Sequence, residues 1–184
     1  TLGHCDGLLA NDAFRYLVEN IGEGGQLCPS HPHTRPLIRK MLGEFAEINT
    51  GPVMHIGGDE AWSLNDDERC KKRGLSDAEL YLDHFRWVIR ETKRLGKRPA
   101  MWGDMLLKHP EIIPEIDRDV IIFDWHYDSG SADTIRLFQK HGFEVIPTTS
   151  INEFAAHLFP FSTIERGIKP LMRELVTHRL LPRH

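Results

Sequence analysis

Strand and helix patterns alternate along this chain of 184 residues, and the alternation limits the possible folds more than any other feature of the sequence. Four short apolar runs have the length and composition of buried strands, and segments with apolar residues at helical spacing separate them. The predicted strands lie at residues 53–56, 98–102, 119–125 and 143–147. Strands that alternate with helices predict βαβ units and a parallel sheet.

The helical segments carry recognisable start and stop signals. Ser76 and Glu79 have the spacing of a capping box, which predicts the start of a helix that Gly96 ends. Residues 35–49 have apolar positions three and four residues apart, which is typical of an amphipathic helix. Further helices are predicted at 109–116, at 131–141 before Gly142, and from 151 onward in two pieces that are broken near Pro160.

Residues able to bind a ligand or to do chemistry follow every predicted strand. In a (β/α) barrel the active site lies at the carboxyl ends of the strands, whereas a doubly wound open sheet binds its ligand at one switch point. Such residues after all four strands favour the barrel. Four strands do not close a barrel, which takes roughly 250 residues, so we predict an α/β fold that is a partial (β/α)8 TIM barrel. The residues that follow the four predicted strands are Asp59-Glu60, Trp102-Gly103-Asp104, Trp125-His126-Tyr127 and Thr148-Thr149-Ser150.

Composition and charge exclude several classes of partner. The net charge of -4 gives no basic surface for nucleic acid or for an anionic membrane. No apolar run approaches the length needed to cross a bilayer. A hydrophobic content of 40% and a charged content of 27% are ordinary for a soluble globular domain. We therefore expect neither nucleic-acid binding nor membrane association.

Cysteines and histidines indicate no metal site in the sequence alone. Cys5, Cys28 and Cys70 are odd in number and irregularly spaced, which predicts reduced thiols and favours a reducing, cytoplasmic compartment. His31 and His33 lack a matching cluster at ligand spacing, so solvated loop histidines are the preferred interpretation. We expect no metal and no organic cofactor.

The segment from His55 to Glu60 concentrates the chemistry of the chain. Neighbouring side chains on a strand point to opposite faces, so two adjacent acids normally diverge. Gly57 and Gly58 relax the backbone just before Asp59 and Glu60 and let both acids turn off the strand end together. Two acids in different environments are able to divide acid and base roles at neutral pH. The alternative is a strand that ends in a solvated acidic turn.

His55-Ile56-Gly57-Gly58-Asp59-Glu60 resembles the central signature of glycoside hydrolase family 20, the β-N-acetylhexosaminidases. Three looser matches point to the hexosaminidase D type within that family. They are Gly3-His4-Cys5-Asp6, Trp102-Gly103-Asp104-Met105-Leu106 and Asp124-Trp125-His126-Tyr127.

The resemblance also assigns places in the barrel to the predicted strands. Gly3-His4 resembles the segment after the third strand, and the strands at 53–56, 98–102, 119–125 and 143–147 become the fourth to the seventh. Residues 1–184 are then expected to form a segment of a single catalytic barrel, from the end of strand 3 through helix 7, that lacks strands 1, 2 and 8. Unpaired sheet edges predict that this segment alone is inactive and prone to aggregation.

The resemblance implies a retaining, substrate-assisted mechanism for removing a terminal β-linked GlcNAc or GalNAc, in which the sugar's own acetamido oxygen attacks and forms an oxazolinium intermediate. Glu60 would be the general acid and later the base, and Asp59 would orient the acetamido group. An acid in that role holds its proton near neutral pH, which a second carboxylate close by favours. His4 would help to hold the acid, or be a core histidine, and His55 would fix the loop.

Five further residues are expected to contact the sugar. Trp102 and Trp125 resemble the aromatic walls of a sugar pocket, on which apolar sugar faces stack; the alternative is that they are barrel core. Asp104, Tyr127 and Asp6 are candidate partners of sugar hydroxyl or acetamido groups, and Asp104 is equally able to cap the following turn.

One departure from the family pattern concerns the N-acetyl group. Many members have a Tyr and an Asp after the seventh strand, where this chain has Thr148-Thr149-Ser150-Ile151-Asn152. The grip on the acetamido group and the choice between GlcNAc and GalNAc therefore stay open.

Two other functions remain as alternatives. The first is a non-catalytic carbohydrate-binding relative, which the presence of Glu60 disfavours. The second is a metal-dependent barrel hydrolase, whose ligands would have to come from His4, His55, Asp59 and His126, among which no two show a ligand motif.

Overall fold

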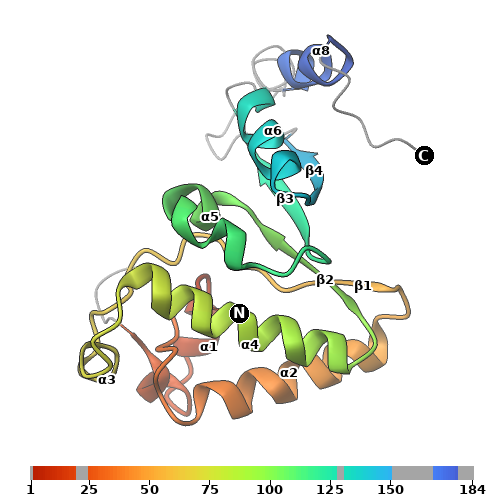
Figure 1. Cartoon of the computed structure of the whole chain (residues 1–184). Coiled ribbons are helices and arrows are strands. Elements are labelled where there is room, and N and C mark those ends of the chain that lie inside the picture. The colour runs from red at the N-terminus through yellow and green to blue at the C-terminus, as the bar shows by residue number, and fades with distance from the viewer. Residues whose placement is uncertain (1, 20–24, 128–130, 151–167, 178–184) are drawn as a thin grey trace, which may run out of the picture.

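A four-stranded parallel sheet forms the centre of the molecule. The computed structural model describes residues 2–19, 25–127, 131–150 and 168–177. The strands pair in the order in which they occur in the sequence, and each lies beside its predecessor (Figure 1). They are β1 (Val53–His55), β2 (Arg98–Trp102), β3 (Ile121–Trp125) and β4 (Glu144–Thr148). All four predicted strands are confirmed, with no end shifted by more than two residues.

Helices connect each strand to the next, which makes every unit βαβ. α4 leads from β1 to β2, α5 and the 3-10 helix η2 lead to β3, and α6 leads to β4. The helices are α1 (Asp6–Leu9), η1 (Arg15–Leu17), α2 (Thr34–Ile48), α3 (Glu68–Lys71), α4 (Asp77–Arg94), α5 (Asp104–Lys108), η2 (Pro110–Glu115), α6 (Ala132–Lys140) and α8 (Lys169–Thr177).

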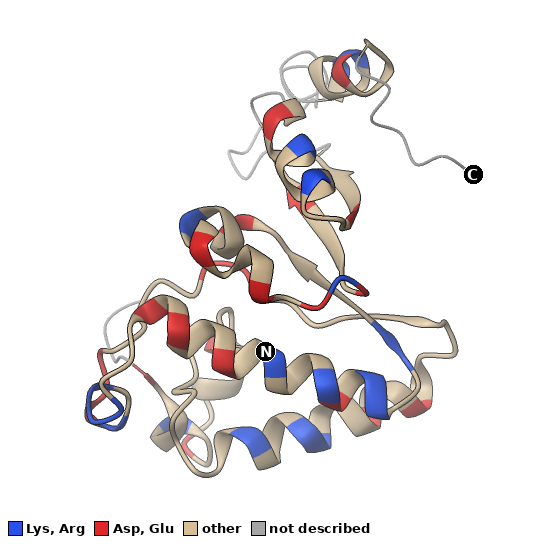
Figure 2. Cartoon of the chain, in the orientation of Figure 1, with Lys and Arg blue, Asp and Glu red and all other residues tan. Residues whose placement is uncertain are grey.

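α4 follows its sequence signals closely. Ser76 and Glu79 form the predicted capping box, and the chain leaves the helix through Gly96 at a φ of 73°. Figure 2 shows acidic residues at its first turns and basic residues at its last turns, an order that favours the helix dipole. α2 lies beside α4 (Figure 1), and Arg39 of α2 pairs with Glu91 of α4 at 2.9 Å.

The helices that connect the strands pack on one face of the sheet. Gly58 lies against Phe85 of α4 and Met101 of β2, and Gly103 lies against Ile122 of β3 and Phe138 of α6. Because Met101 and Ile122 are register partners, α4 and α6 cover the same face. A doubly wound sheet would carry helices on both faces. The structure is therefore the partial (β/α)8 barrel that the sequence predicts.

Several local predictions need correction or completion. The helix expected at 109–116 is the 3-10 helix η2, which contains Pro114, and a proline removes a donor from the backbone ladder of an α-helix. α5 was not predicted, because its five residues are too few to show a period. Most of the tail expected to be helical from 151 lies outside the described residues, and α8 is its described part. None of the helices described is long and apolar enough to span a membrane.

Candidate active site

The loop after β1 turns sharply as the two glycines leave the strand. Gly57 and Gly58 have φ angles of 75° and 105°, and Glu60 follows at 48°. A side chain on Gly58 would lie 2.9 Å from the Tyr81 hydroxyl, so glycine is required there for space as well as for backbone angle. The Tyr81 hydroxyl donates to the Gly58 carbonyl oxygen at 2.6 Å and holds the turn from α4.

Both acids of the loop point to the same side and meet at one histidine. Nε2 of His4 lies 3.1 Å from Oδ2 of Asp59 and 3.0 Å from Oε2 of Glu60. Gly3 allows this approach, because a Cβ there would lie 2.7 Å from the Asp59 carbonyl oxygen. The prediction that the acids turn off the strand end together is confirmed. They are partly accessible, with 23% of the Asp59 side chain and 39% of the Glu60 side chain exposed.

Asp104, the first residue of α5, joins the ends of three strands. Its Oδ2 accepts the backbone N–H of Glu60 at 2.9 Å, and its Oδ1 accepts the indole N–H of Trp125 at 3.3 Å. Burial raises the pKa of the Asp104 carboxyl, Asp59 adds to that effect, and the two hydrogen bonds oppose it. A carboxylate at this position holds Glu60 in its left-handed conformation, which costs a non-glycine residue about 1–2 kcal/mol.

Trp125 and Tyr127 form an aromatic pair beside the acids. Their ring centroids are 5.1 Å apart at an interplanar angle of 35°. The pKa of the Tyr127 hydroxyl is raised first by burial and then by the charges of Glu60 and Asp59, so this side chain lies within their field. The carboxyl end of β3 therefore contributes its aromatic residues to the acid cluster.

Trp102 and His55 pack together on the sheet face opposite α4. Their ring centroids lie 4.6 Å apart, and Phe123 of β3 contacts both rings. Nδ1 of His55 accepts the backbone N–H of Gly57 at 3.1 Å, which ties the strand end to the turn. Burial lowers the pKa of His55, although Asp59 acts in the opposite direction.

The structure thus brings most of the predicted residues to one edge of the sheet. Asp59, Glu60, His4, Asp104 and Trp125 are linked by direct contacts, with Tyr127, His55 and Trp102 next to them. Asp6 is exposed at the start of α1, and within the described ranges no contact joins its side chain to this group. The roles of all these residues in binding and catalysis stay predictions.

Two supporting groups were missed in the sequence. Tyr81 lies in the apolar repeat of α4 and looks like core until its hydroxyl is placed under Gly58. Asp124 is 1% exposed on β3, and it accepts from Thr134 at 2.6 Å and lies 3.1 Å from Nε2 of His126. That contact raises the pKa of His126. A charged residue in an otherwise apolar strand was the available signal for this network.

The ligand set considered for a metal-dependent hydrolase does not come together. His55 is engaged with Gly57 and His126 with Asp124, and none of the four candidates belongs to a metal-binding group among the described residues. Over the residues that the structure describes, the one group arranged to hold a metal is elsewhere, at Glu19, Cys28 and Cys70. The sequence shows no ligand motif for this group, because segments distant in sequence assemble it.

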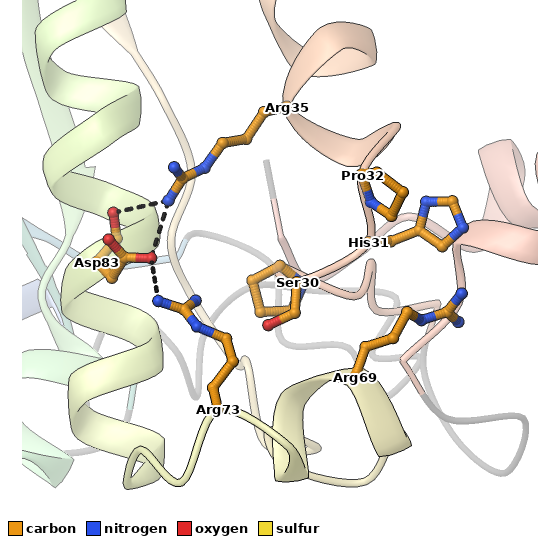
Figure 3. Close-up of a pocket in the computed structure, with 8 residues that line it drawn as sticks. Ser30, His31, Pro32, Arg35, Arg69, Arg73 and Asp83 are labelled. Atoms are coloured by element: carbon orange, nitrogen blue, oxygen red, sulfur yellow. Dashed lines mark hydrogen bonds and ion pairs between the residues drawn. The ribbon is translucent and has the colours of Figure 1, made fainter.

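A separate pocket of about 350 Å³ lies between α2, α3 and α4 (Figure 3). Asp83 of α4 pairs with both Arg35 and Arg73 at 2.9 Å across it. His31 lines the pocket and is 9% exposed, so the prediction of a solvated loop histidine is wrong for this residue. Its Nδ1 accepts the backbone N–H of His33 at 3.1 Å, so this ring nitrogen has a partner. The pocket does not include any of the acids of the β1 loop.

Comparison with solved structures supports the fold. A Flavobacterium johnsoniae chitobiase superposes with a TM-score of 0.67 at 18% identity, over 82% of this chain and 25% of its own. A family 20 exo β-N-acetylglucosaminidase from Vibrio harveyi, solved with N-acetylglucosamine, gives 0.62 at 20% identity over 83% of this chain and 25% of its own. At these identities the likeness shows the fold alone.

Comparison by sequence is more specific. Hexosaminidase D of Bos taurus is 25% identical over 97% of this chain and 54% of its own length, so the chain spans about half of that curated relative. The model of the glycosyl hydrolase family 20 catalytic domain matches residues 10–155, which include β1 to β4 and the acid pair. This chain therefore belongs to glycosyl hydrolase family 20.

Proposed function

We propose that residues 1–184 form part of one catalytic barrel of a β-N-acetylhexosaminidase that removes terminal β-linked GlcNAc or GalNAc from a glycan. The observation that carries the proposal is the pair of adjacent carboxylates, Asp59 and Glu60, turned to one side and joined through His4. Family membership and the names of the similar proteins support the same activity.

Glu60 is the general acid in this proposal. It protonates the glycosidic oxygen of the leaving group and then takes a proton from the attacking water. Its partial exposure leaves it open to substrate and water, while Asp104 holds its backbone. His4 contacts its carboxylate at 3.0 Å and keeps the side chain in position.

Asp59 orients the 2-acetamido group of the substrate. The acetamido oxygen attacks the anomeric carbon as the leaving group departs, and the resulting oxazolinium ion is opened by water, so the anomeric configuration is retained. The Asp59 carboxylate stabilises the positive charge that develops on the acetamido nitrogen. No metal or organic cofactor takes part in this sequence of steps.

The aromatic residues and Asp104 build the sugar pocket in this proposal. Trp125 and Trp102 offer ring faces to the apolar face of the sugar, and Tyr127 directs its hydroxyl to the acetamido group. Asp104 positions Glu60 and Trp125, and its remaining lone pairs accept from a sugar hydroxyl. Asp6 contacts a sugar hydroxyl from α1. The Thr148-Thr149-Ser150 segment replaces the Tyr and Asp of many relatives near the N-acetyl group.

The test uses the full-length protein and p-nitrophenyl β-GlcNAc and β-GalNAc as substrates. Glu60→Gln is expected to lower kcat about 100- to 10,000-fold, the range that a general acid contributes. Glu47→Gln, an exposed carboxylate on α2, is the matched control and keeps wild-type turnover. A folded wild-type protein that binds N-acetylglucosamine but turns over neither substrate would overturn the proposal in favour of a carbohydrate-binding relative.

A further inference from the structure

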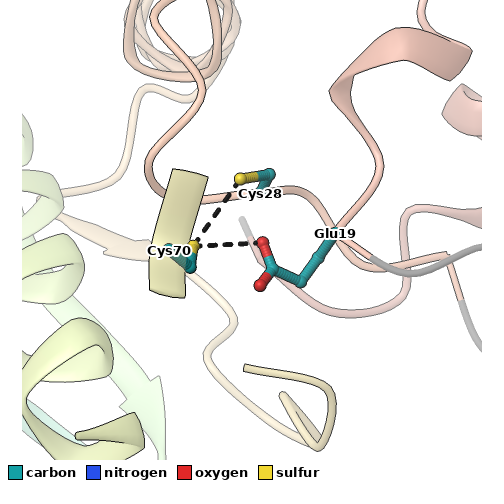
Figure 4. Close-up of side chains that lie close together, drawn as sticks. All are labelled: Glu19, Cys28 and Cys70. Atoms are coloured by element: carbon teal, nitrogen blue, oxygen red, sulfur yellow. Dashed lines mark hydrogen bonds between the residues drawn. The ribbon is translucent and has the colours of Figure 1, made fainter. Parts of the chain in front are cut away.

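Glu19, Cys28 and Cys70 meet in the interior, away from the acid pair (Figure 4). They come from three segments: Glu19 follows η1, Cys28 follows the bridge residue Leu27, and Cys70 lies in α3. Cys28 and Cys70 are fully buried, and Glu19 is 4% exposed. The three ligand atoms all lie within 4.8 Å of one another.

The spacing of the ligand atoms matches a tetrahedral metal site. The two Sγ atoms are 3.6 Å apart, and Sγ of Cys70 is 3.2 Å from Oε2 of Glu19. Two thiolates at about 2.3 Å from a tetrahedral zinc ion lie about 3.8 Å apart, and a thiolate and a carboxylate oxygen lie about 3.5 Å apart. A disulfide would bring the sulfurs to about 2.05 Å.

Glu19 is oriented in the way that metal-binding carboxylates are. Its Oε1 accepts the backbone N–H groups of Asp66 and Asp67, each at 3.1 Å. Its Oε2 is left to face the thiols. Hydrogen bonds from outer groups that fix one oxygen and direct the other are typical of metal ligands.

The cluster gathers two thiols and one carboxylate in a buried place. Buried charges are stable only when paired or bound to a metal. A divalent cation is a partner that two sulfur atoms and a carboxylate oxygen at this spacing are able to bind.

We propose that Glu19, Cys28 and Cys70 bind a divalent zinc ion as a structural site. The hydroxyl of Ser30, 3.1 Å from Sγ of Cys70, or a water molecule supplies the fourth ligand. On binding, each thiol releases its proton to solvent and each sulfur forms a bond to the metal, so no oxidant is needed. This site goes beyond the proposed glycosidase chemistry and departs from the absence of metal that the sequence predicts.

The metal would join the segments on both sides of the acid pair. Glu19 holds the backbone of Asp66 and Asp67, which follow Glu60 in the chain. Leu27, next to Cys28, donates its N–H to the Leu2 carbonyl oxygen at 2.9 Å, and Leu2 leads to His4. Zinc at this place therefore stabilises the fold around the site without contacting the substrate.

The experiment measures metal directly on the reduced full-length protein. After dialysis in metal-free buffer, elemental analysis is expected to find about one zinc per chain. After removal of zinc, titration with Co²⁺ is expected to give the thiolate-to-cobalt charge-transfer absorption in the near ultraviolet. Acidification releases the metal, because protons compete for the thiolates.

Variants distinguish this site from adventitious binding. Cys28→Ser and Cys70→Ser are expected to lower zinc affinity by more than the roughly 10- to 100-fold that changing an outer group costs. Glu19→Gln keeps an oxygen for the two backbone donors, so the protein folds while zinc affinity falls. Cys5→Ser is the matched control and keeps full affinity, since the Cys5 thiol donates to the backbone carbonyl oxygens of Leu2 and Gly3 and is not part of the cluster.

Three results would overturn the inference. The first is a reduced, folded protein that binds no stoichiometric zinc. The second is cobalt absorption that survives in both Cys28→Ser and Cys70→Ser. The third is a Cys28–Cys70 disulfide, found by mass spectrometry without reduction, in a protein that binds no metal once reduced. A failure of the glycosidase assay would not affect any of these readouts.

Discussion

The acid pair after β1 and the Glu19 cluster both contain carboxylates, but they differ in contact with water. The His4, Asp59 and Glu60 side chains are 58%, 23% and 39% exposed, whereas Cys28 and Cys70 are fully buried. Exposed carboxylates exchange protons with solvent and substrate, as acid catalysis needs. Buried anionic groups have no such exchange and need a cation. In the two proposals, the same residue type therefore serves catalysis at one place and structure at the other.

The two regions also differ in backbone conformation. The acid pair lies on a turn that contains Gly57, Gly58 and Glu60 at positive φ. Glu19 instead accepts two ordinary backbone N–H groups of the 66–67 segment. Strained backbone concentrates at functional sites, where the surrounding contacts hold it. Variants that change an acid side chain and variants that change the strained turn should therefore have different effects on activity and on stability.

The largest effect is expected on activity without a loss of stability. Asp59→Asn is expected to lower kcat roughly 100-fold or more, since an amide stabilises the developing positive charge less than a carboxylate does. The free energy of unfolding, measured with urea, is expected to stay near the wild-type value, because the side chain is partly exposed. Asp133→Asn, whose side chain is 99% exposed, is the control. Equal loss of activity in both variants would contradict the role of Asp59.

Adding one methyl group to the turn is expected to have the next largest effect. Gly58→Ala combines a positive φ with a contact at 2.9 Å to the Tyr81 hydroxyl, so it is expected to lower the free energy of unfolding by more than about 2 kcal/mol. Gly74 also has a positive φ but has open space around it, so Gly74→Ala should cost about 1 kcal/mol of stability. Equal costs in urea denaturation would show that the crowding at Gly58 is unimportant.

Removing the hydroxyl beneath the turn is a smaller change. Tyr81→Phe leaves the Gly58 carbonyl oxygen without its buried donor, and is expected to cost about 1–2 kcal/mol of stability. Turnover is expected to fall with it, because the turn carries both acids. Tyr16→Phe removes a hydroxyl from a half-exposed ring and should lie within about 0.5 kcal/mol of wild type. A Tyr81→Phe protein as stable and active as wild type would contradict this support.

The smallest expected effect depends on pH. The contact with Asp124 raises the pKa of folded His126, so this pair contributes stability that is fully present below the unfolded value of about 6.5 and is lost as pH rises through the folded pKa. The difference in free energy of unfolding between wild type and His126→Gln should therefore be larger at pH 6 than at pH 9. A difference that grows with pH would have the wrong sign.

Sequence patterns predicted the sheet and the acid pair because both are local. Alternation and the capping box at Ser76 depend on neighbours in the chain, and the two glycines lie directly before the acids. The Glu19 cluster was not predictable, since 51 residues separate Glu19 from Cys70. Tyr81 was missed for a similar reason: its place in the apolar repeat of α4 hides the hydrogen bond that it donates to another segment.

The central claim is that the acid pair carries out substrate-assisted hydrolysis, and a thiazoline analogue of the oxazolinium intermediate tests it most directly. In the full-length protein, the analogue should block hydrolysis of p-nitrophenyl β-GlcNAc competitively and bind at least about 100-fold more tightly than N-acetylglucosamine, as an analogue of the reacting state does. Asp59→Asn should lose most of that preference. Turnover that the analogue leaves unchanged would contradict the mechanism.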